Sequence, residues 1–296
     1  MSSSRGLAVG DSQYRVSTDL NEFLGVFDLD PVGDGVYRGC RSGDDDFGLY
    51  GGHLLGQSVA AAFETVDEQR LVHSLHAYFL RGGDGTEPVD YRVDRVRDGR
   101  SFCTRRVTAE QKGKDIFEMT ASFQTPEVAR AELEPSMPSG VLAPEVLPTF
   151  EECIEKVGPI FGEQWTSKPF ESRIAHAPWA PTGPSADGGI DYWFRVAGDL
   201  DDSHGLHASI LAYVSDDSIS DNMLVPYGVT WGTPEAMLVS LDHAMWIHRP
   251  FRLDEWIYVE QRPVVSAGGR GLSTGQMWTA DGLLVATMTQ EALARF

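Results

Sequence analysis

Three polar side chains in the second half of the chain lie on segments that are otherwise apolar. Gln290 belongs to the strand-like run 284–292. Alternate residues of a strand share a face, and all the other residues on the face of Gln290 are apolar. Ser240 lies in a second apolar run, MLVSLDHAMWIHRP, at residues 237–250. If that run is one continuous strand, the residues on the face of Ser240 are Leu238, Asp242, Ala244 and Trp246.

The third polar side chain, Asp216, comes near the end of the helix-like run 204–217. It shares a stripe of small and polar residues with Ser209 and Ala212. One helix and two strands can bring Asp216, Ser240 and Gln290 together between a helix and a sheet. There, a carboxylate can act as a general base toward water, whereas a hydroxyl and a carboxamide can only orient the water at neutral pH. Each residue alone is more often structural, so the functional interpretation depends on their convergence.

A different catalytic arrangement would use Ser240 as a nucleophile with Asp242 and His243. Two observations oppose it. Ser240 and His243 have opposite parity if they share one regular strand, and the sequence holds no nucleophile elbow. We therefore do not expect a Ser-His-Asp triad.

Neither a metal site nor a phosphate loop is indicated. The close histidine pairs are His73 with His76 and His243 with His248, and no third ligand follows at a known spacing. The glycine-rich run GGHLLGQ at 51–57 lacks the Gly-Lys-Ser/Thr ending of a phosphate loop. We expect no metal and no cofactor.

The elements that must position these residues occur twice. The run RLVHSLHAYFLRG at 70–82 is a divergent copy of 237–250, and each copy is followed by further strand-like runs. A helix-like run precedes each copy, at 51–66 and at 204–217. The sequence therefore predicts an α+β unit, one long helix against one antiparallel sheet, present twice in tandem.

The expected division of the chain follows from this repeat. We expect a flexible segment at 1–17, a first unit at 18–125, a proline-rich linker at 126–168, and a second unit at 169–296. Residues 126–184 hold ten of the 16 prolines, which favours a linker there.

Composition excludes several classes of protein. A net charge of -20 argues against nucleic-acid binding, which needs clustered Lys and Arg. No apolar run reaches the roughly 18 to 20 residues of a membrane span, and the first residues lack the apolar core of a signal peptide. Three cysteines, far apart, match no disulfide framework. We expect a cytoplasmic protein.

Several motifs together resemble the acyl-CoA thioesterase II family, whose members are double hotdog proteins. The motifs are LYGGHLLGQSVAAAFETV, RLVHSLHAYFLRGGD, RDGRSFCTRRVTAEQ, IFEMTASFQ, LAYVSD, LDHAMWIHRPF, DEW and DGLLVATMTQE. They cover most of the chain outside the linker. The resemblance implies the fold just predicted, because a hotdog is one long helix wrapped by an antiparallel sheet.

The resemblance also implies an activity, the hydrolysis of acyl-CoA to a fatty acid and CoA. The catalytic Asp, Thr and Gln of the family fall on Asp216, Ser240 and Gln290. Ser240 departs from the usual Thr but keeps the hydroxyl, so we expect its role to survive with looser positioning. His53 departs from the Gln that commonly follows the paired glycines, which alters the mouth of the pocket.

Further site residues follow with less support. The backbone amides of Gly51 and Gly52, at a helix start, are candidates for stabilising an oxyanion. His73 matches a family histidine and is a candidate pocket residue, although a structural role is at least as common for a strand histidine. Arg270 and Arg100 are candidate contacts for the CoA phosphates.

Two other functions remain open, a hotdog enoyl-CoA hydratase and a non-catalytic acyl-CoA-binding protein. A hydratase would need a His with a carboxylate at the start of the second helix, which the sequence does not clearly offer. Because tandem hotdog units usually bury apolar surface against another copy, we expect a homodimer or homotetramer.

Overall fold

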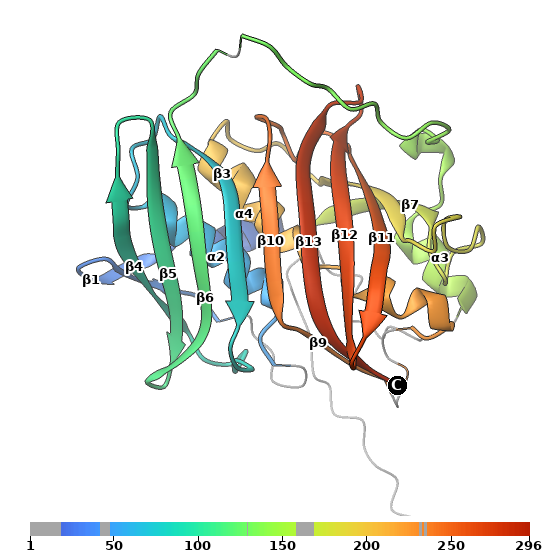
Figure 1. The fold of residues 1–296 in the computed structure, drawn as a ribbon, viewed down its shortest axis with the longest axis horizontal. Helices are drawn as coiled ribbons and strands as arrows, with labels where there is room; N and C mark the ends of the chain where they lie inside the picture. Colours follow the sequence, from blue (N-terminus) through green and yellow to red (C-terminus); the bar gives the residue numbers. More distant parts are fainter. Residues whose placement is uncertain (1–18, 42–47, 129, 158–168, 231–232, 234–235) are drawn as a thin grey trace, which may run out of the picture.

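The computed structural model describes residues 19–41, 48–128, 130–157, 169–230, 233 and 236–296. The predicted flexible segment 1–17 lies outside these residues. The described strands form one sheet in the order β1-β2-β4-β5-β6-β3-β10-β13-β12-β11-β8-β7, with β9 paired to β13 off this path (Figure 1). Every pairing between strands is antiparallel.

The strands of the first half are β1 (Asp30–Gly33), β2 (Val36–Gly39), β3 (Leu71–Phe79), β4 (Val89–Asp98), β5 (Phe102–Gln111) and β6 (Lys114–Gln124). Those of the second half are β7 (Phe170–His176), β8 (Asp191–Val196), β9 (Met237–Ser240), β10 (Asp242–Ile247), β11 (Ile257–Ala267), β12 (Arg270–Thr279) and β13 (Leu284–Arg295). The helices are α1 (Leu20–Leu24), α2 (Gly51–Phe63), α3 (Phe150–Val157) and α4 (His204–Ser215). Short 3-10 turns are η1 (Gly25–Phe27), η2 (Pro144–Val146), η4 (Asp221–Met223) and η5 (Val225–Tyr227).

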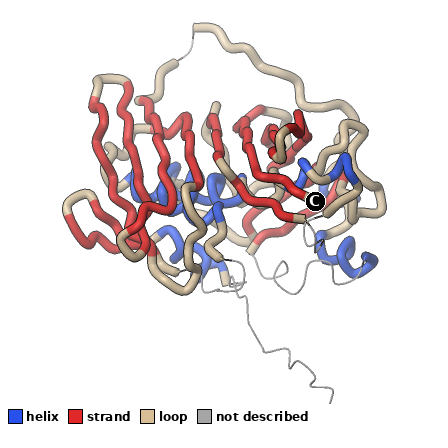
Figure 2. The backbone as a smooth tube through the Cα atoms, turned by 60° about the horizontal axis from the view of Figure 1, so that its bottom comes forward, coloured by secondary structure: helices blue, strands red, loops and turns tan. Residues whose placement is uncertain are grey.

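The two long helices lie side by side on one face of the sheet, and the sheet curves around them (Figures 1 and 2). This is the predicted unit of one helix and one antiparallel sheet, present twice, and the predicted fold is confirmed. Both helices end slightly earlier than the sequence pattern predicts, at Phe63 and Ser215.

The two copies of the repeated run pair with each other. β3 and β10 are adjacent antiparallel strands at the middle of the sheet, with Leu75 opposite Met245 and Ala77 opposite His243. All four of these side chains are buried under the helices. The repeat therefore builds one continuous sheet over a shared core.

Close packing of α2 on α4 depends on glycine. A Cβ on Gly56 would stand 2.9 Å from the carbonyl oxygen of Ser209, and one on Gly52 would overlap the carbonyl oxygen of Tyr213. Because glycine has no Cβ atom, the backbones of the two helices can contact each other directly at these positions. The C-terminal end of α4 is thereby held against the N-terminal end of α2.

Part of the predicted linker packs on the second unit. Leu147 joins Trp193, Tyr258 and Trp278 in a small apolar cluster, and the indole nitrogen of Trp193 donates to the carbonyl oxygen of Leu142 at 2.9 Å. The same segment also contains the short helix α3. The domain boundaries themselves stay a prediction.

No helix in the described part of the chain is both long and apolar enough to cross a membrane. Within the same residues, no group of three or more His, Cys, Asp or Glu side chains is arranged to hold a metal ion.

Candidate active site

Asp216 caps the C-terminal end of α4, where a negative charge is unfavourable with respect to the helix's own dipole. The N-terminal end of α2 lies on the other side of this carboxylate. A Cβ on Gly51 would stand 2.5 Å from Asp216 Oδ2, so the first residue of α2 is in direct contact with the carboxylate. The favourable end of one helix thus faces an acid placed at the unfavourable end of the other.

Gln290 connects Asp216 and Ser240, so the three residues predicted from the sequence form one hydrogen-bonded cluster. Its Nε2 donates to Asp216 Oδ1 at 2.8 Å and to Ser240 Oγ at 2.8 Å. Gln290 is fully buried, and it lies on the core face of β13 with Ala286, Met288 and Ala292. Alternation along this regular strand correctly placed the carboxamide on the buried face.

Ser240 reaches the cluster through an irregularity that the sequence pattern did not show. It pairs with Ala292 of β13, whereas Ala244 pairs with Thr289, so four steps along one strand match three along the other. This is a β-bulge at Leu241, and a bulge reverses the faces of all residues beyond it. The expectation of one regular strand over 237–250 was therefore wrong. Asp242, Ala244 and Trp246 lie on the face opposite Ser240, with Trp246 exposed.

The bulge brings His243 into the site. Its Nδ1 lies 2.5 Å from Gln290 Oε1, and its Nε2 lies 2.9 Å from Ser215 Oγ. His243 is 1% exposed, and burial lowers its pKa to about 4, so the ring is neutral at physiological pH. The sequence interpretation missed His243 and Ser215. The parity argument had placed His243 on the wrong face, and no Gly or Pro marks the bulge.

A Ser-His-Asp triad is not assembled among the described hydrogen bonds. Ser240 is bonded to Gln290, and Asp242 Oδ1 instead accepts from the backbone N–H of Glu291 at 2.8 Å. Ser209, which the sequence grouped with Asp216, donates to the carbonyl oxygen of Gly205 within its own helix.

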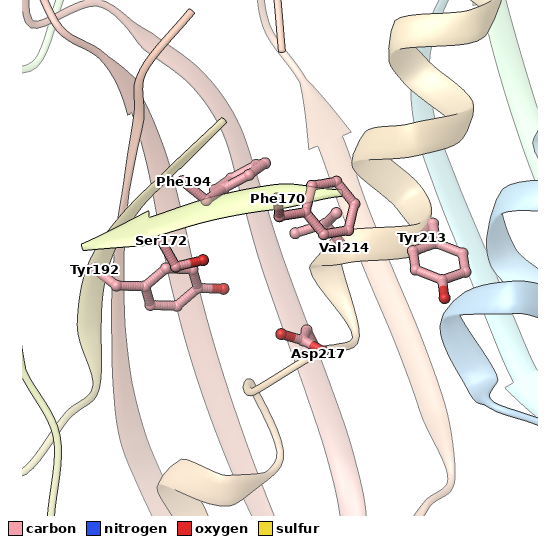
Figure 3. A pocket seen from close by; sticks show the side chains of 7 residues that line it. All are labelled: Phe170, Ser172, Tyr192, Phe194, Tyr213, Val214 and Asp217. Carbon is pink, nitrogen blue, oxygen red and sulfur yellow. The ribbon is translucent and has the colours of Figure 1, made fainter. Parts of the chain in front are cut away.

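A pocket opens beside the last turn of α4. Figure 3 shows it between β7, β8 and the helix end, with aromatic side chains around it and Asp217 at its base. Its lining residues are Phe170, Ser172, Tyr192, Phe194, Tyr213, Val214 and Asp217. An adjoining pocket, about 460 Å³ including the part open to solvent, shares Ser172, Tyr192 and Asp217 with it and continues to Ile174, Trp179 and Asp221. The walls are mainly apolar and the base carries carboxyl groups.

Comparison with known proteins decides the family. A model described as the acyl-CoA thioesterase C-terminal domain matches residues 144–294, and one described as the N-terminal domain matches residues 42–124. The chain belongs to the acyl-CoA thioesterase family.

Relatives of this thioesterase family match over nearly the whole chain. Mouse acyl-coenzyme A thioesterase 8 is 34% identical, over 100% of this chain and 97% of the relative. The crystal structure of acyl-CoA thioesterase II TesB2 from Mycobacterium marinum is 37% identical with a TM-score of 0.76, covering 92% of this chain and 97% of that one. A hot dog fold protein from Alicyclobacillus acidocaldarius, 20% identical, has a TM-score of 0.73 and covers 93% of this chain and 98% of that one, which supports the fold.

The two histidines singled out from the sequence, His73 and His53, lie apart from the cluster of Asp216, Ser240 and Gln290 in this member of the thioesterase family. His73 is half-buried, and its Nε2 is 2.8 Å from Ser122 Oγ while its ring contacts Phe102. His53, the departure after the paired glycines, lies inside α2 with its Nε2 3.0 Å from the carbonyl oxygen of Cys40. Burial lowers the pKa of His53 to about 4.

The two candidate CoA contacts, Arg270 and Arg100, lie at opposite ends of the sheet along the direction of its strands. Arg270 begins β12, opposite Leu293 near the end of β13, and its Nε donates to Glu291 Oε1 at 2.9 Å. Arg100 lies in the turn between β4 and β5, at the end where β3 begins (Figure 1). Arg270 is therefore at the end of the sheet that holds Ser240 and Gln290, and Arg100 is not.

The first copy of the unit holds apolar residues at the two strand positions that match Ser240 and Gln290. Val72 of β3 takes the place of Ser240, because it pairs with β6 as Ser240 pairs with β13. By the same register, Ala121 of β6 takes the place of Gln290. Both are at most 1% exposed. The Ser240–Gln290 hydrogen bond of the second copy is therefore replaced in the first copy by two apolar residues of the core.

Proposed function

We propose that this chain hydrolyses acyl-CoA thioesters to a free carboxylic acid and CoA. The observation that carries the proposal is the buried hydrogen-bonded cluster in which Gln290 donates to both Asp216 and Ser240. A carboxylate, a hydroxyl and a carboxamide around one point can hold a water molecule next to a general base. Membership of the acyl-CoA thioesterase family supports the thioester as the bond that this water attacks.

The reaction needs one water and no cofactor. Asp216 accepts a proton as the water oxygen attacks the thioester carbonyl carbon, the Ser240 hydroxyl holds that oxygen in place, and Gln290 fixes Asp216 and Ser240 through its two N–H groups. The tetrahedral intermediate then expels the CoA sulfur, which takes up a proton. Positioning of this kind supplies several kcal/mol of the barrier reduction, with about 7 to 11 kcal/mol as its ideal limit.

The developing oxyanion needs fixed N–H donors. The backbone amides of Gly51 and Gly52 belong to the first turn of α2, beside Asp216. First-turn amides have no acceptor within their helix and lie at its positive end. We assign them the oxyanion, with His73 outside the reacting centre.

The acyl chain is assigned to the aromatic pocket beside α4. Asp217 lines this pocket and is the chain neighbour of Asp216, the proposed general base. The pocket is therefore next to the reacting group. Mainly apolar walls favour burial of a hydrocarbon chain. For CoA, Arg270 is the better of the two arginine candidates, because it lies at the same end of the sheet as Ser240.

A homodimer or homotetramer stays a proposal, supported by apolar surface on the central strands. Tyr78 of β3 is 62% exposed and Trp246 of β10 is 37% exposed, both on the face away from the helices. Sedimentation of the purified chain tests this. The cytoplasmic location also stays a prediction.

The deciding experiment is continuous detection of free thiol from acyl-CoAs of several chain lengths. Hydrolysis releases CoA, whereas hydration of an enoyl-CoA and simple binding do not. Steady turnover supports the thioesterase proposal, and the profile over chain length identifies the preferred acyl group. Binding of acyl-CoA without thiol release at any length would contradict it.

A further inference from the structure

His243 is a buried titratable group that touches the proposed water site but has no part in the reaction as written. It lies on β10, is 1% exposed, and contacts Gln290 through Nδ1 and Ser215 through Nε2. A buried imidazole with both nitrogens engaged is fixed in its plane. The question is what this fixed ring does for Gln290.

Gln290 can function in only one of its two amide orientations. Its NH₂ group must face Asp216, because a carboxylate accepts hydrogen bonds and repels a carbonyl oxygen. A flipped carboxamide would direct Oε1 at Asp216 Oδ1 and would lose the donor to Ser240. In water the two orientations are nearly isoenergetic, so the protein must select one.

The required orientation leaves Gln290 Oε1 facing His243 Nδ1. An amide oxygen only accepts, so Nδ1 must carry the imidazole proton and donate it. Neutral imidazole has one N–H, so Nε2 is then the acceptor, facing the hydroxyl of Ser215. The Ser215 hydroxyl has a single proton, so in this arrangement it is donated to Nε2 and not to the carbonyl oxygen of Ala212, which lies 2.9 Å from Oγ in the last turn of α4.

These contacts close a ring. Ser215 and Asp216 are neighbours at the end of α4, Gln290 bonds to Asp216 from β13, and His243 spans from Gln290 on β13 back to Ser215. The ring therefore fixes the helix end and two strands relative to one another. Its members are 7% exposed or less, so water does not compete for these bonds.

We propose that His243, with Nδ1 protonated and Nε2 held by Ser215, is a positioning residue that selects the amide orientation in which Gln290 donates to Asp216 and Ser240. The proposal rests on the hydrolysis proposed above. His243 does not touch the reacting atoms and moves no proton in the reaction. It acts through Gln290 alone.

Two amide variants of His243 distinguish the role of Nδ1 from that of Nε2. In His243→Asn the side-chain nitrogen takes the place of Nδ1 and keeps a donor to Gln290, whereas in His243→Gln it takes the place of Nε2. His243→Leu removes both. We expect His243→Leu and His243→Gln to lower kcat about tenfold to a hundredfold with little change in KM, the size of one lost buried hydrogen bond. His243→Asn keeps most of kcat.

A double-mutant cycle tests whether His243 acts through Gln290. In a Gln290→Ala background, His243→Leu should lower kcat no further, because the group that it positions is gone. His207→Leu is a matched control, since His207 is 2% exposed on α4 and accepts from the backbone N–H of Leu253 at 3.2 Å. It should leave kcat within about twofold even where the melting temperature falls.

The tautomer gives a readout that needs no activity. In the ¹⁵N-histidine-labelled full chain, nitrogen chemical shifts should show His243 protonated at Nδ1. A proton on Nε2 overturns the proposal, as does an equal loss in kcat from His243→Leu with and without Gln290. A wild-type chain that releases no thiol refutes the hydrolysis, while the Nδ1 or Nε2 proton still supports or overturns the orientation. If His243→Leu does not fold, His243→Asn and His243→Gln provide the test. A low kcat in His243→Asn together with a normal kcat in His243→Gln overturns the proposal.

Discussion

Gly51 and Asp216 are in contact across the junction of the two long helices, so closely that a single methyl group on Gly51 would stand 2.5 Å from Asp216 Oδ2. The same methyl would stand 2.8 Å from a ring carbon of Phe79. Neither neighbour leaves room for it without movement. The contact places the N-terminal turn of one repeat against the acid of the other, so the proposed site uses both halves of the chain.

Gly51→Ala should therefore displace the Asp216 carboxylate. We expect kcat to fall at least about tenfold, because small displacements of a catalytic group cost up to about two orders of magnitude. The matched control is Gly205→Ala, near the start of α4. There the added methyl would stand 3.3 Å from the Phe63 ring, a contact that a small ring movement relieves. Thiol-release kinetics of the two variants check the prediction, and equal kcat values would contradict it.

Asp216→Asn should lower kcat by about two orders of magnitude or more, since the amide cannot take a proton from water. Asp242→Asn is its control. Asp242 accepts from the Glu291 backbone through Oδ1, and an amide oxygen can accept the same bond. We expect its kcat to stay near that of wild type. A large loss in Asp242→Asn with an active Asp216→Asn would instead support a Ser-His-Asp arrangement.

Ser240→Ala removes one of the two acceptors of the Gln290 NH₂ group. A lost buried hydrogen bond costs about 1 to 3 kcal/mol, so we expect kcat to fall about fivefold to a hundredfold. Ser240→Thr keeps the hydroxyl and restricts its rotamer, because β-branched residues are stiff at χ1. Its kcat should equal or exceed that of wild type. A threonine variant as slow as the alanine variant would show that the hydroxyl is not what matters.

Ser172→Phe tests the assignment of the acyl pocket. Ser172 lines both adjoining pockets, and a phenyl ring there would occupy much of the space between β7 and α4. We expect kcat/KM to fall at least about tenfold for long-chain acyl-CoA and to change little for acetyl-CoA. The short substrate is the internal control. An equal loss for both would mean that the variant damages the fold or the reacting centre.

Asp221→Asn should stabilise the protein more as the pH rises. Burial, with repulsion from Asp217 and Asp216, raises the pKa of Asp221 from its ordinary value of 3.8 to about 8. The unfolded chain releases this proton near pH 4, so Asp221 destabilises wild type progressively between about pH 4 and pH 8. The melting temperature of Asp221→Asn should exceed that of wild type by more at pH 8 than at pH 5. A difference independent of pH would contradict the raised pKa.

The sequence predicted the architecture because its repeat and its apolar periodicity are regular. Gln290 could be placed on the buried face because β13 alternates without interruption from Ala286 to Ala294. Ser240 was placed on the right face, but the face of His243 was predicted wrongly. A single extra residue at Leu241 decides that face, and it arises from how β9 and β10 pair with β13 rather than from local composition.

The first half of the chain shows the same irregularity. β3 carries a bulge between Val72 and Ser74, at His73, in its pairing with β6. Both copies of the repeated run are thus bulged near the same place, which a comparison of the two copies by sequence alone does not reveal. The motifs identified the three residues of the candidate site, but the hydrogen-bonded ring through His243 and Ser215 required coordinates.

Because β3 and β10 pair directly, the hydrogen bonds of the sheet run without interruption from one repeat into the other. The two halves therefore cannot swing apart about a hinge, since opening would break central sheet pairing and expose the buried helices. Heat or denaturant should unfold both repeats in a single cooperative transition. Substrate must therefore enter and product must leave while the two halves stay joined.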